Sequence, residues 1–164
     1  MPSSLESAVT VGDIMVSPAP YVRCADHLVS ASRLMRDLDL RALPICEPDG
    51  RVVGMLRDRD IVTCCVAEDD NPSTVTAREF AEGPPVRVRP WLRVHHALHL
   101  MLSQRLTYLP VVEHERLVGF IDLGAVLDAT AAQSALPPRD RTDVVEAAEV
   151  VDLDEHRDGC RAQV

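Results

Sequence analysis

The sequence predicts an α/β (α+β) protein made of two β-α-β-β-α units that pack sheet against sheet. Two observations carry this prediction: one stretch of chain occurs twice, and each copy alternates apolar runs of strand length with a stretch of helical periodicity. The composition agrees, because 46% of the 164 residues are hydrophobic and 26% are charged, as in a folded globular chain. A unit of roughly 60 residues rarely holds a sufficient core alone, so we expect the copies to pack together.

The duplication is visible directly in the sequence. Shifting the chain by 66 residues places Val22–Glu47 on Val88–Glu113, with nine identities in 26 positions. The identical pairs are Val22/Val88, Arg23/Arg89, Ala31/Ala97, Leu34/Leu100, Met35/Met101, Leu40/Leu106, Leu43/Leu109, Pro44/Pro110 and Glu47/Glu113. After a one-residue deletion in the next turn, Arg51–Gly54 falls on Arg116–Gly119 with three further identities. Chance rarely produces such agreement, so the two stretches are copies of one unit.

Each copy predicts the same order of elements. A short extended segment, Tyr21–Arg23 or Val86–Arg89, precedes a helix that is marked by apolar residues at helical spacing. These residues are Leu28, Ala31, Leu34, Met35 and Leu38 in the first copy and Val94, Ala97, Leu100 and Met101 in the second. Asp26 is the expected N-cap of the first helix.

Two short apolar runs follow each helix and predict a hairpin. In the first copy, LPIC and RVVGML flank Glu47–Gly50, and an Asp-Gly pair between apolar runs is a strong hairpin signal. The second copy has LPVV and RLVGFI around a shorter turn, Glu113–Glu115, without glycine. A closing helix is expected from Asp58 to about Ala67 and from Leu123 to about Ala132.

These patterns divide the chain into four segments. They are an N-terminal extension (1–10), the first unit (11–70), the second unit (71–133) and an acidic C-terminal tail (134–164). The polar stretch AEDDNPSTVT, residues 67–76, reads as the linker between the units. We expect the tail to be mobile or docked on a partner, with a helix as one option for Asp143–Val151.

Composition excludes several classes of protein. No apolar run approaches the ~18 residues of a membrane span, and the N-terminus lacks the pattern of a signal peptide. A net charge of −9 disfavours nucleic-acid binding. All 17 basic residues are arginine, which leaves no lysine for Schiff-base or P-loop chemistry. The five cysteines form no CxxC pair, and their odd number without an export signal predicts reduced thiols and a cytoplasmic protein.

The repeated motifs resemble the CBS domain (the cystathionine-β-synthase type). The resemblance is carried by VGDIM (11–15), RALPICEPDGRVVGMLRDRDIV (41–62) and LTYLPVVEHERLVGFIDLGAVL (106–127). It covers about Val11–Ala132, most of the chain. The LPIC and GML-DRDIV stretches are especially similar to small stand-alone CBS-pair proteins of the actinobacterial hypoxia-response type.

The resemblance implies a Bateman module, in which two CBS repeats are related by pseudo-two-fold symmetry and dimerise into a disc. It also implies two clefts between the repeats, which in many relatives bind an adenine nucleotide (AMP, ADP or ATP) or S-adenosylmethionine. The family signature Gly-x-Ile-Thr-x-x-Asp supplies the Asp for the ribose hydroxyls and the Thr for ribose or phosphate. This chain keeps the Asp as Asp60 but has Arg57 for the Thr in the first copy. The second copy has Asp122 and Ala125 at the two positions.

These departures predict two unlike clefts. Ala125 offers a ribose no acceptor, and Asp122 would repel a phosphate, so the second cleft is expected to be empty or specialised. In the first cleft, Arg57 either clamps a phosphate through charge-assisted hydrogen bonds or pairs with Asp60 and plugs the cleft. The family's geometry implies further cleft residues, which are Val22, Arg41, Ala42, Val88, Thr107 and Tyr108. Tyr108 either stacks on a base or packs between the sheets with its hydroxyl satisfied.

Two other groups of side chains suggest chemistry. His95 and His99 share a helical face and are candidate metal ligands, but a stable zinc site needs a third or fourth ligand, so no metal is expected. Cys64 and Cys65 are adjacent, and an adjacent pair rarely forms a structural disulfide. We expect both to be buried free thiols that act as small hydrophobic residues.

The residues and the resemblance together predict a regulatory protein and not an enzyme. We expect a cytoplasmic homodimer that binds, or formerly bound, an adenine nucleotide between its repeats and signals to an unidentified protein partner in trans. The alternative is a ligand-free homodimeric interaction scaffold with degenerate clefts. Neither hypothesis includes catalysis. The sequence agrees, because it holds no HExxH, Walker or GxGxxG motif.

Overall fold

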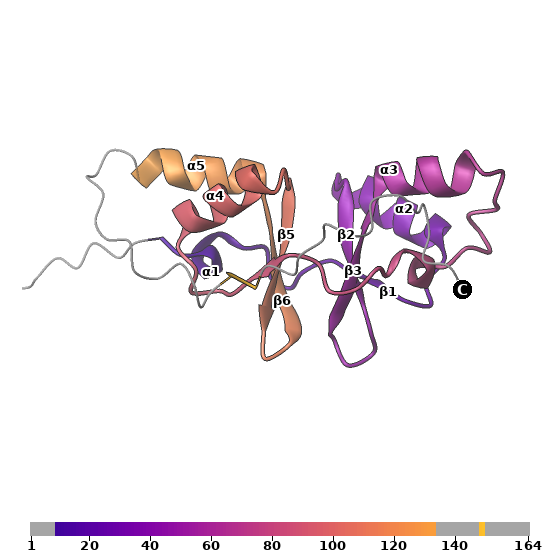
Figure 1. Ribbon diagram of the computed structural model, residues 1–164, viewed down its shortest axis with the longest axis horizontal. Helices are drawn as coiled ribbons and strands as arrows, with labels where there is room; N and C mark the ends of the chain where they lie inside the picture. Colours follow the sequence, from indigo (N-terminus) through magenta and orange to yellow (C-terminus); the bar gives the residue numbers. More distant parts are fainter. Residues whose placement is uncertain (1–8, 134–147, 150–164) are drawn as a thin grey trace, which may run out of the picture.

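The computed structural model describes residues 9–133 and 148–149. Two similar units lie side by side, with their sheets facing one another at the centre and their helices on the outer flanks (Figure 1). The first sheet has the strand order β1-β2-β3, and the second has the order β6-β5-β4-β7. The predicted fold class and the β-α-β-β-α order of each unit are confirmed.

The elements follow the duplication closely. The first unit contains β1 (Val22–Arg23), α2 (Leu28–Leu38), β2 (Ala42–Cys46), β3 (Val52–Arg57) and α3 (Asp58–Ile61), which continues as the π-helical turn η1 (Val62–Val66). The second contains β4 (Arg87–Val88), α4 (Val94–Ser103), β5 (Tyr108–Glu113), β6 (Arg116–Asp122) and α5 (Leu123–Gln133). Short elements precede the units, namely α1 (Val11–Ile14) and the 3-10 helix η2 (Ala77–Phe80). No helix in this described part of the chain has the length and apolarity to cross a bilayer.

Strand register repeats between the units. Val22 pairs in parallel with Ile45, and its copy Val88 pairs in parallel with Val111. The hairpin β2–β3 has a bulge between Ile45 and Cys46, and β5–β6 has one at the matching position after Val111. The duplication therefore extends to irregularities of the backbone.

The start of each first helix differs from the prediction. Asp26 is not the N-cap of α2: His27 takes that position, and the Asp26 carboxylate accepts the backbone N–H of Arg23 at 2.9 Å. The first donors of α2 are satisfied by chain that is distant in sequence, since the Leu28 N–H meets the Val75 carbonyl at 3.0 Å. The first donor of α4 is satisfied in the same way, with the Val94 N–H 3.1 Å from the Val9 carbonyl. Backbone from another segment thus replaces a side-chain cap.

The segment that precedes each unit completes the core of the other unit. Val11 is fully buried in the second core, whereas Val75, Ala77 and Phe80 are buried in the first core. The polar stretch expected to be a linker therefore ends in residues that pack. The division of the chain at residue 70 stays a prediction.

This exchange brings a crossing segment close to one glycine in each unit, with backbone against Gly54 and a side chain against Gly119. A Cβ added at Gly54 would lie 2.9 Å from the Ala81 Cα and 3.0 Å from the Phe80 carbonyl oxygen. The matching Gly119 lies against the Met15 side chain, which a Cβ would overlap. The identity of these two glycines in the repeat is explained by the crossing segments, because any larger residue would displace them.

The sheets contact one another through a small apolar cluster near the hairpin turns. Cys46, Val52 and Val112 are buried there, and Leu117 packs against them. The Leu117 N–H also donates to the Gly50 carbonyl at 3.0 Å, which joins the two hairpins directly. The predicted packing of sheet against sheet is confirmed by this cluster.

The tail holds one described element. β7 (Ala148–Glu149) pairs antiparallel with β4, with Arg87 opposite Glu149. The helix expected over Asp143–Val151 is therefore wrong at these two residues, because their backbone extends the second sheet. The remainder of the predicted tail lies outside the described residues.

We expect Gly54→Ala to lower the free energy of unfolding by about 1–3 kcal/mol, because the new methyl group meets backbone that cannot move aside. Urea unfolding of the full chain measures this loss. Gly124→Ala in α5 is the matched control, since its added Cβ meets one carboxylate oxygen of Asp122 and no backbone, and alanine favours a helix. Equal stability of the Gly54→Ala variant and wild type would contradict this account of the crossing.

Candidate functional site

A cleft of about 320 Å³ lies at the boundary of the two units. The first unit contributes the start of β2, the end of β3 and α3, and the second contributes the residues before and at the start of β5. The chain that crosses between the units forms a third wall, from Phe80 to Val86. The volume is at the lower end of the ~300–1,000 Å³ that small-molecule sites span.

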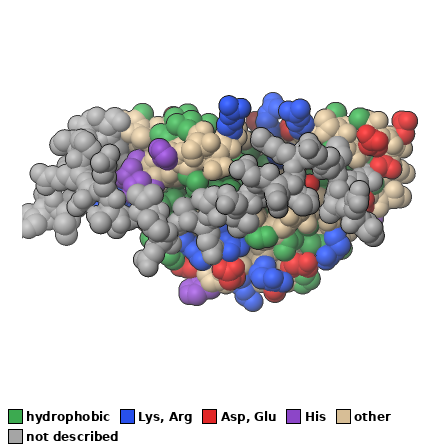
Figure 2. Space-filling view, viewed as in Figure 1, with side chains coloured by type: hydrophobic (Ala, Val, Ile, Leu, Met, Phe, Trp, Pro, Cys, Tyr) green, Lys and Arg blue, Asp and Glu red, His purple; other side chains and the backbone are tan. Residues whose placement is uncertain are grey.

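The cleft combines apolar walls with a basic rim. Its apolar lining is Ala42, Met55, Phe80, Pro85, Val86, Leu106 and Tyr108. Four arginines, Arg41, Arg57, Arg59 and Arg105, also line it, and we call them the arginine rim. Figure 2 shows basic side chains gathered along the upper edge of the molecule, above the boundary of the units. Such a cleft suits a ligand with a flat apolar part and an anionic part.

Arg57 and Asp60 form the ion pair that the sequence suggested. The Arg57 Nε lies 2.8 Å from an Asp60 carboxylate oxygen, and the same oxygen accepts the Arg57 backbone N–H at 3.2 Å. The hydrogen bond that Arg57 donates to Asp60 raises the pKa of the Arg57 guanidinium, against the opposing effect of its partial burial. The Arg57 side chain is nevertheless 66% exposed. The pair therefore forms at one side of the cleft and leaves the cleft open.

The rest of the arginine rim is weakly held. Arg41 reaches Asp58 at 3.5 Å with 80% of its side chain exposed, a geometry that contributes little stability. Arg59 and Arg105 are exposed and form no ion pair within the described part of the chain. Asp58 and Glu82 are the acidic residues of the lining. Four cations against two anions leave the cleft positive within a chain of net charge −9.

Tyr108 joins the two units beside the cleft. Its ring stacks on Phe120, with ring centroids 5.3 Å apart and an interplanar angle of 16°. Its hydroxyl oxygen accepts the backbone N–H of Arg41 at 3.3 Å, across the boundary of the units. Of the two alternatives for Tyr108, this geometry corresponds to packing with a satisfied hydroxyl.

The structure brings together five of the nine residues named from the sequence. Arg41, Ala42, Arg57, Thr107 and Tyr108 line the cleft.

The other four do not line this cleft. Val22 and Val88 are buried in the first and second cores, and Asp60 lies beside Arg57. Asp122 occupies the position in the second unit that Arg57 occupies in the first, and it accepts the Ala125 N–H at 3.0 Å at the start of α5. Their roles in ligand binding stay predictions.

Sequence reasoning missed much of the lining, including two arginines and the crossing chain. Arg59 stands next to the recognised Asp60, and Arg105 stands two residues before the recognised Thr107. The crossing chain from Phe80 to Val86 gave no signal because its contribution depends on the exchange of segments between units. Comparing charges at matching positions of the repeat would have found the two arginines, since Gly124 and Asp39 occupy their positions in the other copy.

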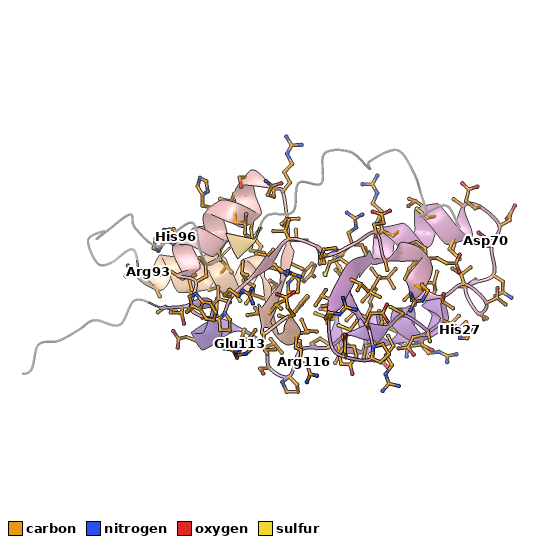
Figure 3. All side chains as sticks on the ribbon, turned by 60° about the horizontal axis from the view of Figure 1, so that its bottom comes forward. His27, Asp70, Arg93, His96, Glu113 and Arg116 are labelled. Atoms are coloured by element: carbon orange, nitrogen blue, oxygen red, sulfur yellow. The ribbon has the colours of Figure 1, made fainter. Side chains whose placement is uncertain are left out.

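The histidine and cysteine groups lie away from the cleft. His95 and His99 are exposed on α4, and the described residues include no group of three or more His, Cys, Asp or Glu side chains placed to hold a metal. Partial burial lowers the pKa of His95, with smaller effects from His96 and Arg93. Figure 3 labels His96 and Arg93 near one another at the α4 end of the molecule.

Three cysteines are buried free thiols, namely Cys24, Cys46 and Cys65. Cys64 is in a disulfide bond. The expectation of a free thiol is therefore wrong at Cys64. An adjacent pair is strained as a disulfide, but Cys64 does not pair with Cys65, whose thiol donates to the Asp70 carbonyl at 3.6 Å.

The family follows from comparison with known proteins. The CBS domain family matches residues 11–67 and 77–132, so this chain belongs to the CBS-domain family and carries two copies of the domain. Among individual relatives, Hypoxic response protein 1 of Mycobacterium tuberculosis is 37% identical over 112 residues, which cover 68% of this chain and 78% of that protein.

Solved structures agree with this assignment. Hypoxic Response Protein I, crystallised with two coordinated zinc ions, is 34% identical and has a TM-score of 0.68, covering 73% of this chain and 98% of that one. CBSX2 in complex with AMP is 22% identical and has a TM-score of 0.66, covering 76% of this chain and 98% of that one. Because CBSX2 is only 22% identical, its similarity to this chain shows the fold alone.

We expect Tyr108→Phe to lower the free energy of unfolding by about 0.5–1.5 kcal/mol, because it removes the acceptor for the Arg41 N–H while keeping the ring on Phe120. Thermal unfolding measures the difference. The matched control is Tyr21→Phe, at the other tyrosine of the chain, which is exposed. A loss of the same size in both variants would show that the bond between the units contributes nothing.

Proposed function

We propose that this protein is a regulatory CBS pair that binds an adenine nucleotide in the cleft between its units. The observation that carries the proposal is the combination of an apolar lining with the arginine rim in a single cleft. Adenine and ribose are accommodated by the apolar walls, and phosphate by guanidinium groups, whose planar forks match phosphate oxygens. The AMP bound by CBSX2, a protein of the same fold, supports this choice of ligand.

The Arg57–Asp60 pair is compatible with phosphate binding. A guanidinium has five N–H donors, and Asp60 takes only the one on Nε. The carboxylate therefore orients the side chain while the terminal nitrogens stay available to a phosphate. The sequence analysis gave two alternatives for Arg57, binding a phosphate or pairing with Asp60. In this proposal Arg57 does both.

Regulation follows from the position of the ligand. A nucleotide in this cleft touches both units and the crossing chain, so it favours one relative angle of the units over another. It shifts that equilibrium only by its difference in affinity for the two arrangements. We propose that a protein partner senses the change, and we assign the chain no catalytic step.

We also propose that the protein acts as a homodimer. Apolar side chains are exposed on the outer helical elements, with Val62 58%, Val66 55% and Leu127 47% exposed. A second copy of the chain would cover these side chains, which offers a reason for their exposure. The competing hypothesis is a dimeric scaffold without a ligand, in which Arg57 pairs with Asp60 and binds no phosphate.

Thermal unfolding with AMP, ADP, ATP and S-adenosylmethionine tests the proposal. A ligand at 100 times its Kd stabilises the fold by about 2.7 kcal/mol. For a chain of this size that raises Tm by roughly 5–10 °C. We expect at least one nucleotide to do so, and Arg57→Met to reduce the shift.

Arg33→Ala is the matched control, because Arg33 is exposed on α2 and does not line the cleft. It should leave the nucleotide shift unchanged. Absence of any shift at millimolar nucleotide would instead favour the ligand-free scaffold.

A further inference from the structure

The two copies of the repeat carry opposite charges at matching positions. The repeat aligns Arg57 with Asp122, and it aligns Arg105 with Asp39. A third position of the arginine rim loses its charge, since Arg59 matches Gly124, whereas Arg41 matches Thr107, which lines the same cleft. Every member of the arginine rim therefore has an acidic or uncharged counterpart. The excess of positive charge in this cleft, four arginines against Asp58 and Glu82, therefore depends on side chains that the repeat does not duplicate.

Arg105 adopts a backbone conformation that its side chain does not favour. It has φ +54°, in the left-handed region, as does its counterpart Asp39 with φ +53°. Aspartate enters this region more readily than other non-glycine residues, whereas arginine has no such preference. This conformation ends both helices in the same way, since the Leu40 N–H donates to the Met35 carbonyl after α2 and the Leu106 N–H donates to the Met101 carbonyl after α4, each at 2.8 Å. The end of α4 thus fixes the position of Arg105, whose exposed side chain lines the cleft.

Arg59 and Arg105 approach the cleft from different units. Arg59 belongs to α3 of the first unit, and Arg105 follows α4 of the second. Both are exposed, and neither forms an ion pair with the described residues, unlike Arg57 and Arg41. One phosphate is served by Arg57 alone. The guanidinium groups of Arg59 and Arg105 can bind further phosphates of the same ligand, one from each unit.

We propose that the arginine rim makes the cleft selective for a nucleoside diphosphate or triphosphate over AMP, and that it excludes S-adenosylmethionine. This inference rests on the proposed function and specifies its ligand. Each added phosphate brings charge to guanidinium groups that are otherwise unpaired, and charge-assisted hydrogen bonds are the stronger kind. S-adenosylmethionine carries a sulfonium cation in place of phosphates, and the net positive charge of the cleft repels it.

Calorimetric titration of the full chain measures the selectivity. The ligands are AMP, ADP, ATP, S-adenosylmethionine and inorganic triphosphate, at low salt and without divalent cations. We expect ADP and ATP to bind at least about tenfold more tightly than AMP, which is the effect of one additional charged hydrogen bond. We expect S-adenosylmethionine not to bind, and inorganic triphosphate to bind more weakly than ATP because it lacks the apolar part.

Arg105→Gly is the informative variant, because glycine adopts the left-handed conformation freely. We expect it to fold at least as stably as wild type and to lose most of the preference for ATP over AMP. Arg59→Ala should reduce the preference as well, and Arg33→Ala on α2 should not.

The outcomes separate this inference from the proposed function. Equal affinity for AMP and ATP overturns the inference and leaves nucleotide binding intact. Absence of binding by all the adenine nucleotides overturns the proposed function. Inorganic triphosphate binding as tightly as ATP overturns the choice of a nucleoside phosphate over a free polyphosphate. An Arg105→Gly variant that keeps the full preference for ATP overturns the role given to Arg105.

Discussion

Each unit of this protein depends on chain that precedes the other unit. Val11 fills the second core, and Val75 and Phe80 fill the first. Backbone carbonyls of the same segments satisfy the first donors of α2 and α4. Because neither core is complete without this crossing, the two sheets are held face to face. The cleft is a consequence, since the chain that must cross from Phe80 to Val86 becomes one of its walls.

The duplication explains why so much of the fold was predictable. Apolar spacing and turn residues are local signals, and they predicted the β-α-β-β-α elements of both units, but not α1, η2 or β7. The predicted cap at Asp26 was wrong because the donors of α2 are satisfied by residues more than forty positions away, which no local pattern reveals. The site was likewise predicted only in part. The family resemblance located Arg57 and Tyr108. Arg59, Arg105 and the crossing chain are recognised as lining only in the folded structure, where both units are present.

The starts of α3 and α5 show how a duplicated fold can diverge in charge. In the first unit the Asp60 carboxylate accepts the Arg57 N–H, and in the second the Asp122 carboxylate accepts the Ala125 N–H. Both arrangements satisfy a free donor at a helix start, so both preserve the backbone. They nevertheless place a guanidinium at the end of β3 in the first unit and a carboxylate at the matching end of β6 in the second. The need to satisfy a backbone donor at the helix start is therefore met equally well by a site that attracts an anion and by one that repels it.

The central claim is that the two halves of this pseudo-symmetric chain are functionally unlike, with one anion site per chain. The stoichiometry of nucleotide binding tests this claim most directly. Equilibrium dialysis of the full chain against saturating radiolabelled ATP counts the bound molecules per chain. The account predicts one. Two molecules per chain would contradict it, because Asp122 and Asp39 stand at the repeat positions that match Arg57 and Arg105, and carboxylates there disfavour a second anion site.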